Sequence, residues 1–194
     1  MKKFKFLLLS ACIALVACTT KTSSEQQVSD KGTKWSWDKG TIVVETPERP
    51  AEQTSVIGLT IPKMEVVRVG FVGLGMRGPG AVERFTYIPG VEIVALCDYE
   101  KERAEKCLKY LQRASMPKAA IYSGEKGYEE LCKRDDIDLV YIATDWLHHF
   151  PVAMCAMENN KNVAIEVPSD MDLQEGWALV HMSERTSKHC MILE

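Results

Sequence analysis

The sequence has no excess of charge of either sign. Its 194 residues carry 24 basic and 27 acidic side chains, which gives a formal net charge of −3. Nucleic-acid binding requires a stripe of basic residues that neutralises phosphates. This balance therefore gives no reason to expect a nucleic-acid partner.

Cysteine pairs at metal-binding spacing are also missing. Five cysteines remain beyond residue 18, an odd number, and no two of them form a Cys-x-x-Cys motif. The spacing indicates neither a disulfide framework nor a zinc site, and no metal is expected. Most of the five are predicted to be small core residues: Cys97, Cys107, Cys132, Cys155 and Cys190.

Long apolar runs are scarce as well. One run, Phe6–Ala17, follows three lysines and is too short to remain in a bilayer, which is typical of a signal peptide. It ends in Leu15-Val16-Ala17-Cys18, which resembles the bacterial lipobox, so residues 1–18 are predicted to be a lipoprotein signal with Cys18 lipidated. A lipobox at Cys12 and a plain secretory signal are the alternatives. The expected location is the periplasm or cell envelope, with a lipid anchor in the membrane.

A polar stretch follows the signal. Residues 19–64 are rich in Ser, Thr, Gln, Lys and Pro and show no sustained periodicity, which predicts a tether. Within it, Trp35, Trp37 and the strand-like run Thr41–Val44 are expected to dock on the folded body.

Strands and helices alternate over residues 65–194. The predicted strands are Val67–Val72, Glu92–Cys97, Ala119–Tyr122, Leu139–Ala143, Asn162–Glu166 and Cys190–Leu193. The predicted helices are Arg77–Tyr87, Glu100–Arg113, Glu125–Lys133, His149–Glu158 and Asp172–Ser187. On the last helix, the predicted inward positions are Leu173, Trp177, Val180 and either Met182 or Ser183. Strict alternation predicts an α/β fold, a doubly wound parallel sheet of the NAD(P)-binding Rossmann type.

A glycine-rich turn follows the first of these strands. Gly73-Leu74-Gly75-Met76-Arg77-Gly78 leads into a helix, and Asp98 stands twenty residues further on, at the end of the second strand. In this context Gly73 permits the tight turn, Gly75 lets the backbone approach a pyrophosphate, and Gly78 lets the helix pack on its strand. The helix N-terminus then faces the phosphates. A glycine-rich turn without a ligand is the structural alternative.

Asp98 is expected to accept hydrogen bonds from the adenosine ribose. A carboxylate there repels a 2′-phosphate, which favours NAD over NADP, although Lys101 and Arg103 lie close enough in sequence to soften that preference. The alternative is that Asp98 only caps the strand end.

Further candidate residues for the cofactor site follow two later strands, at the same edge of the sheet. Trp146 and His149 follow the fourth strand, and Glu166 and Val167 end the fifth. Loops at the carboxyl ends of such strands border the cofactor crevice. Glu166 is interpreted as either a ligand contact or an acceptor that fixes the loop, and each histidine has a surface or capping role as its alternative.

These blocks carry a family resemblance. Residues 66–194 resemble the glucose–fructose oxidoreductase and inositol dehydrogenase (Gfo/Idh/MocA) family in Gly73–Gly78, in the spacing Thr144…His149…Ala153…Ala156, and in Lys161–Pro168. Dehydrogenases of that family usually have Glu-Lys-Pro where this chain has Glu-Val-Pro, and Val167 cannot donate a proton.

One branch shares that departure. The sequence is similar to glycoside hydrolase family 109, the NAD-dependent α-N-acetylgalactosaminidases, in Gly75–Gly78, Trp146–His149, Glu166–Pro168 and His189–Glu194. The resemblance implies that the NAD site is lined by Met76, Arg77, Asp98, Trp146, Leu147, His148, His149, Glu166 and Val167. It also implies cleavage of a terminal α-N-acetylgalactosamine by oxidation at C3, elimination, addition of water and reduction, an exception to the two-carboxylate mechanism.

Family members continue into a second α/β substrate domain, which holds the sugar and the catalytic base. This sequence ends at Glu194, so the resemblance predicts the N-terminal part of such an enzyme, inactive alone, with its catalytic residues beyond residue 194. The alternatives are a sugar oxidoreductase of the wider family and a lipid-anchored nucleotide-binding module without activity. An oligomer is compatible with the sequence.

Overall fold

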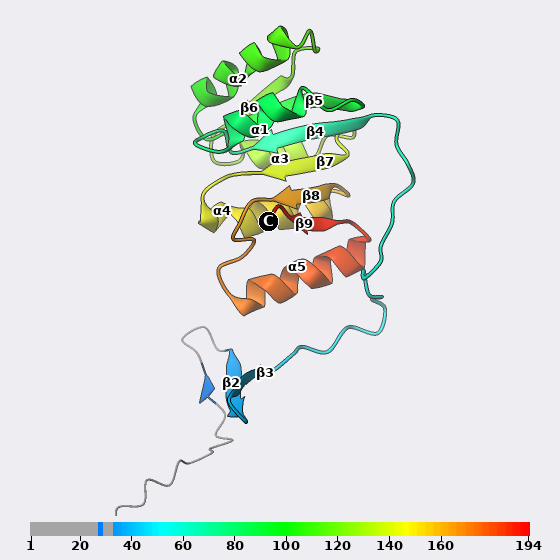
Figure 1. Ribbon diagram of the computed structural model, residues 1–194, viewed down its shortest axis with the longest axis vertical. Coiled ribbons are helices and arrows are strands. Elements are labelled where there is room, and N and C mark those ends of the chain that lie inside the picture. The colour runs from blue at the N-terminus through cyan, green and yellow to red at the C-terminus, as the bar shows by residue number, and fades with distance from the viewer. Residues whose placement is uncertain (1–26, 29–32) are drawn as a thin grey trace, which may run out of the picture. The chain divides into compact units, whose positions relative to one another are not determined.

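The computed structural model describes residues 27–28 and 33–194, which fall into two compact units divided between Glu45 and Thr46 (Figure 1). The predicted signal peptide and Cys18 lie outside the described residues. No helix in the described part of the chain combines the length and the apolar character needed to cross a bilayer.

The first unit contains a small antiparallel sheet in the stretch predicted to be a tether. Its strands are β1 (Gln27–Val28), β2 (Lys34–Asp38) and β3 (Thr41–Val44), in the order β1-β2-β3. Lys39 and Gly40 join β2 to β3 with positive φ angles of 47° and 83°, the requirement of a type I′ hairpin turn. Trp35 and Trp37 pack edge to face, with ring centroids 6.2 Å apart. The predicted strand at residues 41–44 is confirmed.

The second unit is the predicted doubly wound parallel sheet (Figure 1). Its strand order is β6-β5-β4-β7-β8-β9, and every neighbouring pair is parallel. The strands are β4 (Val67–Val72), β5 (Val91–Asp98), β6 (Ala120–Ser123), β7 (Leu139–Ile142), β8 (Asn162–Ile165) and β9 (Cys190–Ile192). The order reverses between β4 and β7, the point at which open α/β sheets place their ligand crevice.

Helices cover both faces of this sheet. They are α1 (Gly78–Phe85), α2 (Lys101–Arg113), α3 (Gly127–Cys132), α4 (Trp146–Glu158) and α5 (Leu173–Thr186). Helices α1 and α2 pack on one face, around Phe71 and Leu96, while α3, α4 and α5 pack on the other, around Ile142 and Ile165. Because both faces of the sheet are buried, the sequences of its strands are continuous runs of apolar residues.

The helices differ from the prediction mainly in the start of α4 and in the buried face of α5. Helix α4 begins at Trp146, three residues before the predicted start, because the Asp145 side chain caps it by accepting from the Leu147 N–H at 3.0 Å. On α5 the buried residues are Leu179, Met182, Ser183 and Glu184, whereas Leu173 and Val180 are exposed. Of the other predicted inward positions, Met182 and Ser183 are buried and Trp177 is half-buried. The buried Glu184, which was not predicted, pairs with Arg49 at 2.8 Å.

The five cysteines beyond residue 18 are unpaired thiols. Cys97, Cys107 and Cys132 are buried in the core, as predicted, while Cys155 and Cys190 are half-buried.

Candidate cofactor-binding site

A cavity of about 750 Å³ opens at the carboxyl ends of β4, β5, β6 and β7. We call it the main cavity. It is lined by Val72, Gly73, Gly75, Met76, Cys97, Asp98, Tyr99, Arg103, Gly124, Glu125, Tyr128, Ala143, Thr144, Asp145, His148 and Val152. It therefore lies at the strand-order reversal, where the topology predicts a ligand.

The glycine loop (Gly73–Gly78) forms one wall of the main cavity, and its glycines are required for different reasons. Gly73 has φ +92°, and a Cβ there would lie 2.5 Å from the Ala143 carbonyl. A Cβ on Gly78 would lie 2.0 Å from the Gly73 oxygen, so the helix could not begin so close to the strand. A Cβ on Gly75 would meet only Arg103, at 3.5 Å, so Gly75 faces open space where a ligand can approach the backbone.

The end of the glycine loop has the features of an anion-binding site. Among the described residues, the backbone N–H groups of Gly75, Met76 and Arg77 have no protein acceptor, and no side chain caps α1. Unpaired N–H groups at a helix N-terminus, together with the helix dipole, favour a phosphate. This geometry fits the pyrophosphate of a dinucleotide.

Asp98 is buried at the end of β5 and holds the glycine loop in place. Its Oδ2 accepts from the Leu74 N–H at 2.6 Å, and its Oδ1 accepts from the Glu100 N–H at 2.9 Å. The Arg103 guanidinium lies 3.8 Å from Oδ1. Each carboxylate oxygen has a second lone pair, so Asp98 keeps the capacity to accept from ribose hydroxyls in the cavity that it lines.

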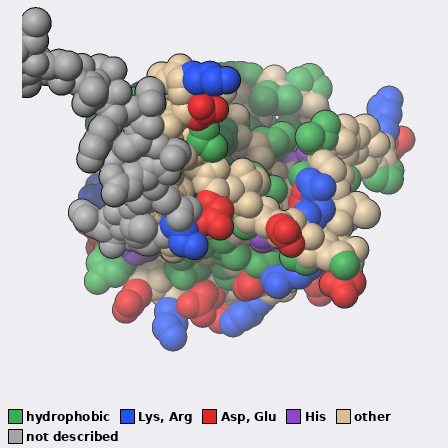
Figure 2. All heavy atoms as spheres, turned by 90° about the horizontal axis from the view of Figure 1, so that it is seen from below, with side chains coloured by type: hydrophobic (Ala, Val, Ile, Leu, Met, Phe, Trp, Pro, Cys, Tyr) green, Lys and Arg blue, Asp and Glu red, His purple; other side chains and the backbone are tan. Residues whose placement is uncertain are grey.

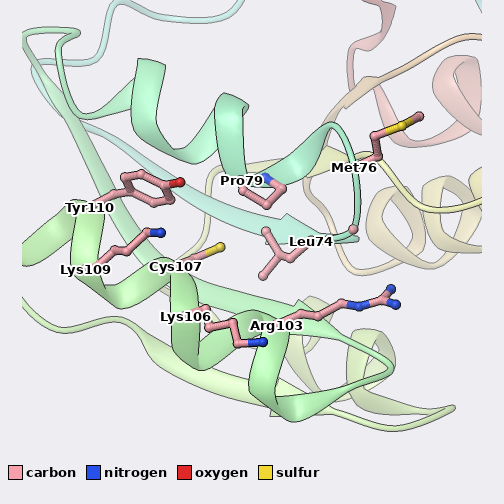
Figure 3. A pocket seen from close by; sticks show the side chains of 9 residues that line it. Leu74, Met76, Pro79, Arg103, Lys106, Cys107, Lys109 and Tyr110 are labelled. Atoms are coloured by element: carbon pink, nitrogen blue, oxygen red, sulfur yellow. The ribbon is translucent and has the colours of Figure 1, made fainter.

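A second pocket of about 450 Å³ adjoins the glycine loop on the side of α2 (Figure 3). We call it the basic pocket. It shares Gly75, Met76 and Arg103 with the main cavity and is further lined by Leu74, Pro79, Lys106, Cys107, Lys109 and Tyr110. Arg103 also pairs with Glu100 at 3.0 Å, so the carboxylates of Asp98 and Glu100 hold its guanidinium where the main cavity meets the basic pocket.

The start of α4 forms the opposite wall of the main cavity. The His148 Nδ1 lies 2.7 Å from an Asp145 carboxylate oxygen, and both residues line the cavity. Partial burial of the Asp145 carboxyl opposes its ionisation, but the hydrogen bonds from His148 and the Leu147 N–H outweigh burial and lower its pKa. A negative charge therefore persists at this wall.

His149 does not reach the main cavity. Its ring is 1% exposed, with Nδ1 2.6 Å from the Pro168 oxygen and Nε2 3.2 Å from the Thr144 oxygen. It bridges the chain segments that leave β7 and β8. The residue predicted to touch the cofactor is thus placed to position the loops around it.

Glu166 acts as a loop-fixing acceptor, one of its two predicted roles. The Tyr141 hydroxyl donates to Glu166 Oε1 at 2.7 Å, and burial, followed by the effect of Glu166, raises the pKa of Tyr141 to about 12. Val167 follows β8 and is 43% exposed.

Five of the predicted site residues line the main cavity: Gly73, Gly75, Met76, Asp98 and His148. The other predicted site residues do not line it: Arg77, Gly78, Trp146, Leu147, His149, Glu166 and Val167. Trp146 and Leu147 are exposed on the first turn of α4, where neither side chain is held by the core. The sequence interpretation missed Tyr99, Glu125 and Tyr128, which have no motif of their own, and their only signal is that each follows a strand end.

Charged side chains elsewhere on the surface alternate in sign. On the face shown in Figure 2, Lys and Arg side chains of the described residues lie interspersed with Asp and Glu side chains. Within the described residues, no group of three or more His, Cys, Asp or Glu side chains is arranged to hold a metal ion.

Comparison with known proteins identifies the family. The family model GFO_IDH_MocA, described as an oxidoreductase family with an NAD-binding Rossmann fold, matches residues 67–193. The chain belongs to this family. Its second unit is therefore an NAD-binding Rossmann domain. The main cavity, beside the glycine loop at the strand-order reversal, is the candidate site for NAD.

A solved structure of a family dehydrogenase has the same fold. The myo-inositol dehydrogenase from Lactobacillus casei, in complex with NAD(H) and myo-inositol, is 26% identical, with a TM-score of 0.56 over 66% of this chain and 35% of that chain. An NAD-binding protein from Listeria innocua is 25% identical, with a TM-score of 0.55 over 66% of this chain.

Curated relatives within the Gfo/Idh/MocA family are glycosidases by name. The chain is 72% identical to glycosyl hydrolase family 109 protein 5 of Phocaeicola vulgatus, over 100% of its length and 38% of the relative. It is 50% identical to a glycosyl hydrolase family 109 protein of Porphyromonas gingivalis, over 96% of its length and 38% of the relative. The predicted resemblance to family 109 is confirmed, and the chain spans less than two fifths of these relatives.

Proposed function

We propose that this chain is the NAD-binding part of an exported glycosidase that removes terminal α-N-acetylgalactosamine from glycans. The observation that carries the proposal is the 72% identity to a family 109 protein over the whole chain. Val167 supports it, because an apolar side chain after β8 cannot exchange the proton that an ordinary sugar dehydrogenase moves at this position.

The residues of the main cavity fit the parts of NAD. The N–H groups of Gly75, Met76 and Arg77 would hold the pyrophosphate, and Asp98 would accept from the adenosine ribose. Bound NAD would supply reversible oxidation of a sugar hydroxyl, the chemistry that makes elimination and hydrolysis possible without a pair of carboxylates. His148 and the exposed Trp146 and Leu147 stand at the start of α4, on the side where the nicotinamide is expected.

The cellular setting in this proposal rests on the signal sequence. Export and lipidation at Cys18 would place the enzyme at the cell envelope, within reach of external glycans. Because NAD is regenerated in each catalytic cycle, one tightly bound molecule would suffice outside the cytoplasm, where free NAD is scarce. The sugar-binding residues and the catalytic base are expected beyond residue 194.

The test is hydrolysis of an aryl α-N-acetylgalactosaminide by the full-length gene product that contains this chain. We expect aglycone release without net NADH, and a loss of at least about tenfold in Asp98→Ala when NAD is limiting. Asp135→Ala is the matched control, since Asp135 is exposed and outside the cavity. Absence of aglycone release by the full-length protein, combined with stoichiometric NADH formation from a free sugar, would instead identify a sugar oxidoreductase.

A further inference from the structure

The basic pocket carries positive charge that the candidate NAD site does not use. Figure 3 shows the pocket between α2 on one side and the glycine loop with the start of α1 on the other. Its volume of about 450 Å³ is within the range of small-molecule sites. Three cationic side chains line it, Arg103, Lys106 and Lys109, and none of the described residues that line it is acidic. The pocket therefore favours an anionic ligand.

The uncompensated charge lies at the end of the basic pocket away from the main cavity. Arg103, which lines both cavities, is held by two carboxylates, at 3.0 and 3.8 Å. Within the described part of the chain, Lys106 and Lys109 form no ion pair. A helix rises 1.5 Å per residue, so these lysines stand about 4.5 Å and about 9 Å further along α2 than Arg103. Two free charges are thus placed beyond the residue that Asp98 and Glu100 neutralise.

The other side chains of the basic pocket are mainly apolar. Leu74 and Cys107 are buried, and Pro79 and Tyr110 are half-buried. The Lys109 ammonium lies 4.8 Å from the centre of the Tyr110 ring, so a charged group and an aromatic face stand together. A ligand with an organic group can bury apolar surface against these side chains while its anionic group reaches the lysines.

We propose that the basic pocket binds a phosphate monoester, with the phosphate at Lys106 and Lys109 and the organic group against the apolar side chains. Lysine ammonium groups bind phosphate as point charges, and two of them match a dianion. Neither lysine lines the main cavity, so the ester binds while NAD occupies that cavity. The inference is independent of the proposed glycosidase activity.

Two ligands carry a phosphate of this kind, a free phosphate monoester and NADP with its 2′-phosphate. The Asp98 carboxylate is buried and lines the main cavity, where it is expected to accept from the ribose and would repel a phosphate on that ribose. Asp98 does not line the basic pocket. A free ester held by Lys106 and Lys109 avoids the repulsion, so the charges favour the free ester.

The experiment titrates phenyl phosphate and inorganic phosphate into the NAD-saturated, full-length gene product that contains this chain, by isothermal titration calorimetry. The ionic strength is kept constant because salt screens exposed charges. We expect saturable binding of both probes, with phenyl phosphate about tenfold tighter because its ring buries apolar surface. Phenol, which lacks the phosphate, should not bind.

Lys106→Ala combined with Lys109→Ala should weaken phenyl phosphate binding by at least about tenfold. The matched control combines Lys101→Ala with Arg113→Ala, which removes the same charge from α2 outside the pocket and should leave the affinity for phenyl phosphate unchanged. Both double variants should keep the NAD affinity of the wild type, since none of the four residues lines the main cavity.

Absence of saturable binding to the NAD-saturated wild type would overturn the inference, as would equal weakening in the two double variants. Binding to the NAD-free protein alone would place the probe in the main cavity and would also overturn it. If the Lys106 and Lys109 substitutions weaken NADP binding while the wild type binds neither free probe, the lysines serve a dinucleotide 2′-phosphate and the inference fails. None of these measurements scores glycoside hydrolysis, so their failure leaves the proposed function standing.

Discussion

Asp98 Oδ2 accepts a hydrogen bond of 2.6 Å from the backbone N–H of Leu74, inside the glycine loop. The residue that is expected to bind the ribose therefore also sets the position of the loop that is expected to bind the pyrophosphate. Asp98 is 6% exposed, and its second oxygen is held by the Glu100 N–H at 2.9 Å. Recognition of two parts of the cofactor is therefore expected to depend on one carboxylate.

Asp98→Ala should therefore weaken both the fold and NAD binding. The loss of two charge-assisted hydrogen bonds, one buried and one part-buried, should lower the free energy of unfolding by about 3 kcal/mol. NAD affinity should fall at least about tenfold, because a loop contact and a ribose contact are lost together. Urea unfolding and isothermal titration calorimetry measure the two effects, with Asp135→Ala as the unchanged control. Unaltered NAD affinity in a folded Asp98→Ala protein would remove Asp98 from the site.

Gly75 and Gly78 should respond differently to alanine. In Gly78→Ala the new Cβ meets the Gly73 carbonyl oxygen at 2.0 Å, so stability should fall by roughly 3 kcal/mol. In Gly75→Ala the nearest atom is an Arg103 nitrogen at 3.5 Å, so stability should stay within about 0.5 kcal/mol while NAD affinity falls. Thermal unfolding and NAD titration of the two variants check this contrast. Equal destabilisation by both substitutions would contradict it.

NAD should bind more tightly than NADP, by about tenfold or more, because the buried Asp98 carboxylate repels a 2′-phosphate. Arg103 lies 3.8 Å from Asp98 and offsets part of that repulsion. Arg103→Ala should therefore weaken NADP binding more than NAD binding. Parallel calorimetric titrations measure the two ratios, and Arg113→Ala, at the far end of α2, is the control. A variant that gains affinity for NADP would refute this role of Arg103.

Acid stability should depend on Asp138. Hydrogen bonds from Arg68, at 2.8 and 2.9 Å, outweigh burial and lower the pKa of Asp138 in the folded state. As the pH falls, the unfolded chain takes up a proton at this carboxyl before the folded chain does. The contribution of ionised Asp138 to the free energy of unfolding is therefore complete above the unfolded pKa of about 4 and is lost as the pH drops through the lower folded pKa. Asp138→Asn should show a smaller loss of stability between about pH 5 and pH 2 than the wild type, measured by urea unfolding across that range. An equal loss of stability in the variant and the wild type would contradict this role of Asp138.

The sheet was predictable from the sequence because its physical signal is local. Continuous apolar runs such as Val67–Val72 are what a strand buried on both faces requires, and the glycine spacing together with Asp98 placed the ligand edge. Predicted strand bounds differ from the observed ones by one residue at most.

The buried face of α5 and the place of His149 could not be predicted, because they depend on contacts that sequence spacing does not show. The buried face of α5 includes Glu184, whose partner Arg49 stands 135 positions away. His149 was assigned to the cofactor, but its two ring nitrogens face the carbonyls of Thr144 and Pro168, which only the folded chain brings together.

The central claim is that the NAD site serves a hydrolytic reaction. It is tested most directly by cleaving an α-N-acetylgalactosaminide in D₂O with the full-length gene product that contains this chain. Oxidation at C3 acidifies the neighbouring C2–H, so the account predicts that the released N-acetylgalactosamine carries one solvent deuterium at C2 and that no NADH accumulates. Hydrolysis that leaves C2 without deuterium would contradict the account, because the bond would then have been cleaved without the cofactor.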